Sequence, residues 1–154
     1  MKSHNVRLAT PDDINEIIRL IGGISNENGL FPLAVNKITK LVHDAVVNRT
    51  MVIGVIGQPA NIEASIALAP GQLWYTDTYN LGDLWHYVWP QYRNSNHAEN
   101  LIEFAKSVAN QMGMDFISGV VAKERVDAKM RLYRKHFDAF LGGCFLHRHM
   151  NGSA

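Results

Sequence analysis

The chain has 154 residues, a length that fits one domain with one hydrophobic core. Apolar residues make up 47% of it and charged residues 19%, as is ordinary for compact soluble proteins. Fifteen basic and fourteen acidic side chains nearly cancel, whereas a nucleic-acid partner calls for a basic excess. No run reaches the roughly 18 apolar residues of a membrane-spanning helix. The sequence therefore predicts one soluble domain over residues 1–154 that binds neither nucleic acid nor membrane.

The sequence has a single cysteine, Cys144, which helps to predict the cellular location of the protein and whether a thiol acts as a nucleophile. One cysteine cannot form an intramolecular disulfide, and the first four residues lack the apolar stretch of a signal peptide. Both observations favour a reducing, cytoplasmic location. Because no motif pairs Cys144 with a histidine, we interpret it as a small buried apolar residue rather than a nucleophile.

The first third of the chain predicts a short strand followed by two helices. Residues 6–9 alternate as in a strand, and Thr10-Pro11 then has the chemistry of a helix start. Isoleucines at helical spacing predict a helix over residues 14–21, which Gly22-Gly23 is expected to end. A loop over residues 24–33 and an amphipathic helix over residues 35–47 follow.

The middle of the chain reads as β-structure. Residues 50–56 and 62–68 are rich in β-branched side chains and flank a turn at residues 57–60, which predicts a hairpin. Pro70-Gly71 is expected to close the second strand, with a loop over residues 72–82.

The remaining elements alternate between strand and helix. We expect strands over residues 83–89, 115–121 and 140–145, and helices over residues 97–112 and 125–136, with Gly113 as a C-cap. This order predicts an α/β chain built around a mixed sheet.

The junction at residues 88–98 is the most informative stretch. A strand breaks at Pro90, crosses a short polar loop and enters a helix, so unpaired N–H groups and the positive end of the helix dipole converge there. An anion such as a pyrophosphate is the natural occupant of such a site. On these residues alone, a loop that only caps its helix explains the pattern as well.

The same stretch resembles the cofactor-binding motif of the GNAT (Gcn5-related) N-acetyltransferases. Val88, Pro90, Tyr92, Arg93 and Ala98 fall on that motif in register. The segment from Leu132 to Phe137 is similar to a second family motif, one residue shorter. The resemblance implies a GNAT-like acyltransferase fold: a mostly antiparallel sheet splayed into a V and flanked by helices. It also implies direct transfer of an acetyl group from acetyl-CoA to a primary amine of unidentified acceptor, without a metal.

The resemblance assigns residues to the cofactor site and to catalysis. The cofactor-binding residues it implies are Val88, Arg93, Asn94, Ser95, Asn96, His97 and Ala98. Tyr133 matches the tyrosine that serves as general acid toward the departing thiolate. For the general base, Asp83 and His86 are the titratable candidates on the preceding strand, and a water-relayed base is a third alternative. Alternation places Asp83 on the face of Trp85, and His86 on the other.

Three departures from the family pattern support a rival interpretation. Asn96 replaces the usual middle glycine of the loop, Val126 replaces an asparagine, and His136 or its neighbour replaces the glycine before Phe137. The alternative is a catalytically silent GNAT-like module for binding or assembly, of the kind found among bacteriophage proteins.

Other clusters have simpler interpretations. His147 and His149, with His136, suggest zinc, but no third ligand stands at motif spacing. Aromatic residues concentrate between positions 74 and 89, where they form core, an acceptor pocket or a homodimer contact. The basic residues around positions 123–135 fit a solvated helix face, with cofactor phosphates as the alternative partner.

Overall fold

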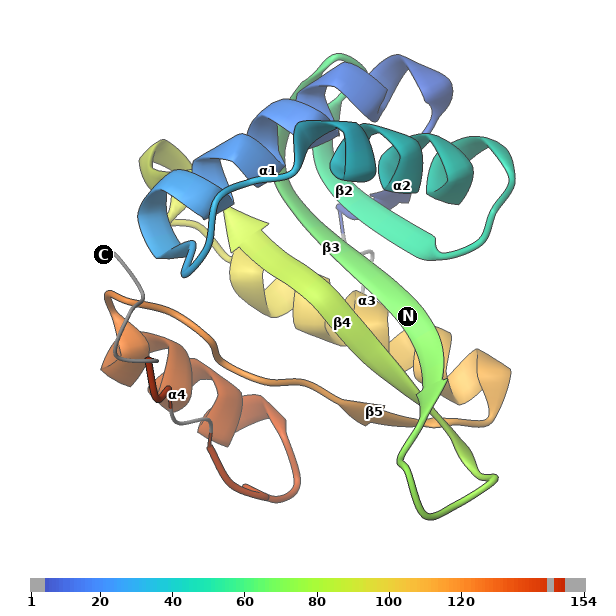
Figure 1. Ribbon diagram of the computed structural model, residues 1–154, viewed down its shortest axis with the longest axis vertical. Helices are drawn as coiled ribbons and strands as arrows, with labels where there is room; N and C mark the ends of the chain where they lie inside the picture. The colour runs from blue at the N-terminus through green and yellow to red at the C-terminus, as the bar shows by residue number, and fades with distance from the viewer. Residues whose placement is uncertain (1–4, 144–145, 149–154) are drawn as a thin grey trace.

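The computed structural model describes residues 5–143 and 146–148 and shows a five-stranded sheet of order β1-β2-β3-β4-β5 (Figure 1). Neighbouring strands are antiparallel except β4 and β5, which are parallel. The predicted mixed, mostly antiparallel architecture is thus confirmed. The strands are β1 Arg7–Leu8, β2 Val52–Gln58, β3 Asn61–Gln72, β4 Tyr79–Val88 and β5 Asp115–Ile117. The helices are α1 Ile14–Asn28, α2 Val35–Val47, α3 His97–Met112 and α4 Val126–His136, with 3-10 turns η1 Pro11–Asp13 and η2 Pro90–Tyr92.

Helices cover both faces of the sheet and divide the core into two clusters. Helices α1 and α2 lie over one face, where Ile17 and Val42 pack with Trp85 and Tyr87. Helix α3 lies over the other face, where Leu101 packs with buried residues of β3 and β4 (Figure 1). Side chains of β4 therefore alternate between two buried layers. Among the described residues, no helix is long and apolar enough to cross a membrane.

Helix α1 is longer than its glycines predicted. The prediction that Gly22-Gly23 ends the helix, with a loop over residues 24–33, is wrong, because α1 continues to Asn28. A Cβ on Gly23 would lie 2.7 Å from the Trp89 ring, so this glycine permits a close contact between α1 and the end of β4. Packing thus overrides the low helix propensity of glycine.

Substituting alanine for Gly22 and for Gly23 is expected to change the stability of the protein in opposite directions. A Cβ on Gly22 meets no atom within 4 Å, so Gly22→Ala should raise the free energy of unfolding by about 0.5–1 kcal/mol. Gly23→Ala should lower it by about 1–3 kcal/mol, because the Trp89 side chain must move. Urea unfolding of both variants checks this pair. Equal changes of the same sign in the free energy of unfolding of the two variants would contradict the close contact between Gly23 and Trp89.

The central hairpin is confirmed, but its strands run further than predicted. Strand β3 passes through Pro70-Gly71 and pairs with β4 as far as Gln72 opposite Tyr79. Residues 79–82, predicted as loop, therefore belong to β4. The turn-forming residues here lie inside a long antiparallel ladder, whose hydrogen bonds outweigh their local preference.

Strand β4 pairs with β5 only near its own beginning. Residues Asn80–Gly82 pair with Asp115–Ile117. Beyond these residues, the segments that continue β4 and β5 separate (Figure 1). The predicted strand over residues 115–121 is thus only three residues long. A register shift leaves Leu84 without a partner on β3, since Ala67 pairs with Trp85 and Leu68 with Asp83. This bulge interrupts the alternation, so the prediction that Asp83 and Trp85 share a face is wrong.

The C-terminal region also differs from its prediction. Residues 140–143 are not in a strand, and the remaining two residues of that predicted strand, Cys144 and Phe145, lie outside the described residues. Helix α4 agrees with its prediction to within one residue, and α2 and α3 agree at both ends. Gly113 caps α3 in a left-handed conformation, φ 65°, as predicted.

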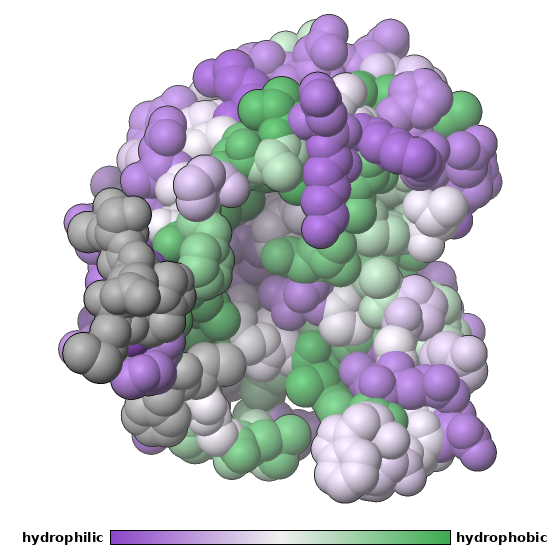
Figure 2. All heavy atoms as spheres, in the orientation of Figure 1, coloured by the Kyte–Doolittle hydropathy of each residue, from purple (hydrophilic) through white to green (hydrophobic). Residues whose placement is uncertain are grey.

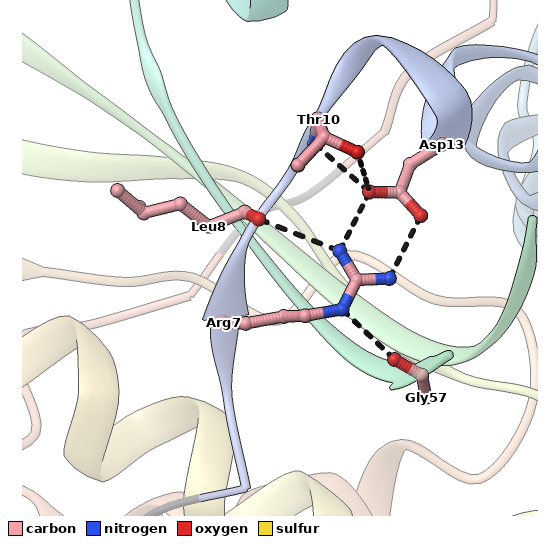
Figure 3. Close-up of polar contacts among 5 residues, drawn as sticks. All are labelled: Arg7, Leu8, Thr10, Asp13 and Gly57. Atoms are coloured by element: carbon pink, nitrogen blue, oxygen red, sulfur yellow. Dashed lines mark hydrogen bonds and ion pairs between the residues drawn. The ribbon is translucent and has the colours of Figure 1, made fainter. Parts of the chain in front are cut away.

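A buried ion pair fastens the N-terminus to the sheet (Figure 3). The guanidinium of Arg7 donates to both carboxylate oxygens of Asp13, over 2.7 and 2.8 Å, and its Nε donates to the carbonyl of Gly57. Thr10 adds two hydrogen bonds to the same carboxylate, from its N–H and its hydroxyl. The Arg7 side chain thus joins β1, η1 and the end of β2.

Candidate active site

A cleft opens where β4 and β5 diverge. It has a volume of about 230 Å³ and is lined by the second half of β4, by residues 119–121, and by side chains of α1 and α4. In Figure 2 this face of the molecule is hollowed between the α1–α2 layer and the segment that carries α4. The cleft therefore follows from the sheet topology, because parallel strands that separate leave a gap that no ladder fills.

The predicted catalytic residues all line this cleft. Asp83 and His86 come from β4 and Tyr133 from α4. The Tyr133 hydroxyl lies 2.8 Å from His86 Nδ1, and the two rings are stacked. Residues 47 positions apart in sequence thus form one hydrogen-bonded unit.

The tautomer of His86 follows from its second partner. His86 Nε2 lies 3.1 Å from the carbonyl oxygen of Ala98, which can only accept, so Nε2 carries the proton. Nδ1 then accepts a hydrogen bond from the Tyr133 hydroxyl. Burial lowers the pKa of His86 to about 4, so the ring is neutral near neutral pH and this arrangement persists.

Tyr133 retains its proton in this setting. Burial raises the pKa of its phenol, and the nearby charge of Asp83 raises it further. Asp83 is itself affected by burial, which is the largest cause acting on its carboxyl and raises its pKa. The cleft thus combines a phenol that holds its proton with a carboxylate made more basic than usual.

The predicted anion-binding loop enters α3 beside the cleft. Ser95 organises it: its N–H and hydroxyl donate to the carbonyl of Tyr92, and its Oγ accepts from the N–H of His97. The N–H groups of Asn96 and Ala98 have no hydrogen-bond partner within the described part of the chain. Asn96 has φ −87°, so its position does not require glycine.

Two of the predicted cofactor residues have other partners in the structure. Arg93 donates from Nη2 to Glu27 over 2.7 Å and from Nε to the carbonyl of Val88 over 3.0 Å. His97 Nε2 lies 2.6 Å from the carboxylate of Glu63. Asn94, Ser95 and Asn96 are exposed on the loop. The side chain of Arg93 is thus directed toward α1 instead of toward the loop.

Val126 and His136, two residues that differ from the family motif, lie in different environments. Val126 is 40% exposed at the start of α4. His136 lies between two carboxylates of α3, 3.5 Å from Glu99 and 3.4 Å from Glu103. His136 thus joins α4 to α3, a packing role that glycine does not supply.

Metal binding finds no support among the residues that the structure describes, which contain no group of three or more His, Cys, Asp or Glu arranged to hold an ion. His147 is described, whereas His149 lies outside the described residues. The proposed histidine pair therefore stays untested.

Sequence reasoning missed the side chains that α1 contributes. Glu27 accepts hydrogen bonds from both Arg93 and Tyr87, and Asn28 lines the cleft. Both fall in the segment predicted as a loop after Gly23. The signal was present, because Ile17, Ile21, Ile24 and Asn28 continue one helical face across the glycines.

Comparison with known proteins defines the fold. No family model and no curated protein match the sequence. Many solved structures do match. A predicted acetyltransferase from Clostridium acetobutylicum, solved with acetyl-CoA, has a TM-score of 0.73 at 16% identity, with 94% of this chain and 95% of that chain covered. A GCN5-related N-acetyltransferase from Ralstonia eutropha has a TM-score of 0.72 at 14% identity, with 96% and 98% covered. An aminoglycoside 6'-N-acetyltransferase from Acinetobacter haemolyticus has a TM-score of 0.67 at 15% identity, with 95% and 99% covered.

Proposed function

We propose that this chain, which has the fold of the GCN5-related N-acetyltransferases, transfers an acetyl group from acetyl-CoA to a primary amine. The observation that carries the proposal is the meeting of Asp83, His86 and Tyr133 in one cleft beside the N-terminus of α3. An acid, a base and an anion site are the three functions that this reaction requires.

The residues present fit acetyl-CoA. The N–H groups of Asn96 and Ala98, at the positive end of α3, are free to bind its pyrophosphate. When bound, acetyl-CoA supplies an activated acetyl thioester. Neither Asn96 nor its neighbours adopt a positive φ, so the loop conformation is available without glycine.

Asp83 is the better candidate for the general base. The basic nitrogen of His86 already accepts the Tyr133 hydroxyl, and its pKa of about 4 makes it a weak acceptor of a second proton. The Asp83 carboxyl, whose pKa is raised, lines the cleft and is free to take a proton from an ammonium. His86 then acts as a positioning residue that orients Tyr133, whose hydroxyl proton turns from His86 Nδ1 to the departing thiolate.

Thermal unfolding with acetyl-CoA tests the cofactor site. At 100 times its dissociation constant, acetyl-CoA should stabilise the protein by about 2.7 kcal/mol, a shift of several degrees. Asn96→Asp should abolish the shift, because a carboxylate would oppose the pyrophosphate. The free variant should be as stable as the wild type, since aspartate is also a good N-cap. Asn96→Gly is the matched neutral control and should keep the shift. No wild-type shift at millimolar acetyl-CoA would favour the catalytically silent alternative.

A further inference from the structure

Besides His86, Tyr87 and Tyr133, the cleft is lined by three polar side chains from three different elements: Asn28 from the end of α1, Asp83 from β4 and Lys129 from α4. Only Asp83 was assigned a role above. The cleft volume of about 230 Å³ is below the roughly 300–1,000 Å³ typical of sites for drug-sized molecules. The part of a ligand that this cleft encloses is therefore compact, and a neighbouring pocket of about 590 Å³ shares Gly119, Val120 and Tyr133 with it.

Asn28 is buried with an unused acceptor. The residue is 7% exposed, and its Oδ1 has no hydrogen-bond partner in the described residues. A buried polar atom without a partner destabilises the protein, because it has lost its hydrogen bonds to water. Such an atom on the wall of a cleft is expected to accept a hydrogen bond from a ligand donor.

Asp83 adds a second acceptor to the same cleft. An ionised carboxylate only accepts hydrogen bonds, as does an amide oxygen. A protonated primary amine carries three donors and a positive charge, so it satisfies both groups at once. The walls contributed by α1 and β4 are therefore suited to an ammonium group.

Lys129 gives the cleft a cation without an ion pair. It is half-buried, and burial lowers the pKa of its ammonium. None of the ion pairs in the described residues includes it. The carboxylate whose charge raises the pKa of Lys129, that of Glu27, already accepts hydrogen bonds from Arg93 and Tyr87. A partly desolvated ammonium in this setting is suited to an anionic ligand group.

We propose that the acceptor is a compact primary amine that also carries an anionic group, with its ammonium bound between Asn28 and Asp83 and its anion bound by Lys129. This inference rests on the proposed function. It defines the substrate class as zwitterionic amines with a carboxylate or phosphate a few bonds from the nitrogen. Simple alkylamines, diamines and uncharged amino sugars fall outside the class.

A matched series of small molecules tests the charge pattern. Chemical-shift titrations by NMR would compare γ-aminobutyrate with butylamine, which lacks the carboxylate, and with butyrate, which lacks the amine. β-Alanine and δ-aminovalerate, with their own single-charge analogues, vary the length. At least one zwitterion should bind about tenfold or more tightly than both its analogues, as expected when one hydrogen bond to a charged group is gained. Equal binding of zwitterion and alkylamine at all three lengths would overturn the proposal.

Two variants test which residue binds the ammonium end of the ligand and which binds its anionic end. Asn28→Leu should weaken the preferred zwitterion and its alkylamine about equally, whereas Lys129→Met should weaken the zwitterion alone. The dispersion of each variant's NMR spectrum shows whether it is folded. A Lys129→Met variant that loses affinity for coenzyme A and keeps its preference for the zwitterion would show that this cation serves the cofactor phosphates, and would overturn the assignment.

The same samples separate the two proposals. Titration with coenzyme A tests the cofactor site without any amine. Coenzyme A binding without discrimination in the amine series rejects the acceptor class and leaves the proposed function standing. If the protein distinguishes among the amines but does not bind coenzyme A, the acetyltransferase function is rejected and an amine-binding cleft is supported.

Discussion

Asp13→Ala is expected to lower the free energy of unfolding by about 3 kcal/mol. Asp13 is fully buried, and its loss leaves the Arg7 guanidinium without its carboxylate and removes the acceptor of two Thr10 hydrogen bonds. Breaking a buried pair costs about 3–5 kcal/mol. The lower end applies here because the Arg7 side chain is 30% exposed and partly solvated.

Urea unfolding measures this effect, with Asp12→Ala as a matched control. Asp12 is the adjacent acidic residue of the same turn, is exposed, and belongs to none of the described ion pairs. Its variant should change stability by less than about 0.5 kcal/mol, as surface substitutions usually do. Equal losses in the two variants would show that the turn's charge, rather than the buried pair, stabilises the fold.

The Asp13 pair also predicts a pH dependence. Burial alone would raise the pKa of Asp13, but hydrogen bonds from Arg7 and Thr10 outweigh it and the net pKa is lowered. A lowered folded-state pKa stabilises the protein above the unfolded value of about 3.9. The stability difference between wild type and Asp13→Ala should therefore be full near neutral pH and should shrink as the pH falls below about 4. A difference that grows on acidification would contradict the assignment.

Tyr133→Phe is expected to reduce the rate of acetyl transfer by about 10²–10⁴-fold, the range for loss of a positioned general acid. The substitution removes only the hydroxyl that donates to His86 and keeps the ring that packs beside Phe137. Acetyl-CoA should therefore still raise the unfolding temperature of the variant.

Steady-state release of coenzyme A thiol, measured with an amine that supports turnover, checks this expectation. Tyr79→Phe, which removes the hydroxyl of a tyrosine 54% exposed at the start of β4, is the control and should retain wild-type activity. A Tyr133→Phe variant with undiminished turnover would remove this residue from the proton-transfer scheme.

Local signals in the sequence were sufficient for much of the fold. Helices α2 and α3 were predicted at both ends, because their apolar faces are regular and Gly113 can adopt the left-handed conformation that closes α3. The β2–β3 hairpin followed from two β-branched runs around a turn. In these elements, local preference and tertiary packing agree.

The errors occur where distant contacts override local preference. Helix α1 continues through Gly23 because the Trp89 ring occupies the space that a side chain at this position would fill. Pro70 remains in strand β3 because β4 pairs with this part of the strand. The bulge at Leu84 has no sequence signal, although it decides which way Asp83 faces. Local pattern cannot report contacts between residues that lie tens of positions apart.

The candidate site was predicted in part. The family resemblance named Asp83, His86 and Tyr133, and the structure brings these three to one cleft. Asn28 was missed because its helix was expected to end earlier, and Lys129 was seen only as one of a run of basic residues. Their placement in one cleft depends on the packing of α1 and α4 around β4, which no spacing in the sequence encodes.

The most direct test is to incubate the protein with acetyl-CoA labelled with ¹³C in its acetyl group, together with a panel of primary amines that includes γ-aminobutyrate. NMR would follow the label. The proposed function predicts that the label moves from the thioester to an amide, catalytically, and that Tyr133→Phe slows the transfer. A label that stays on coenzyme A with every amine, in a protein that acetyl-CoA stabilises, would identify a binding module without acetyltransferase activity.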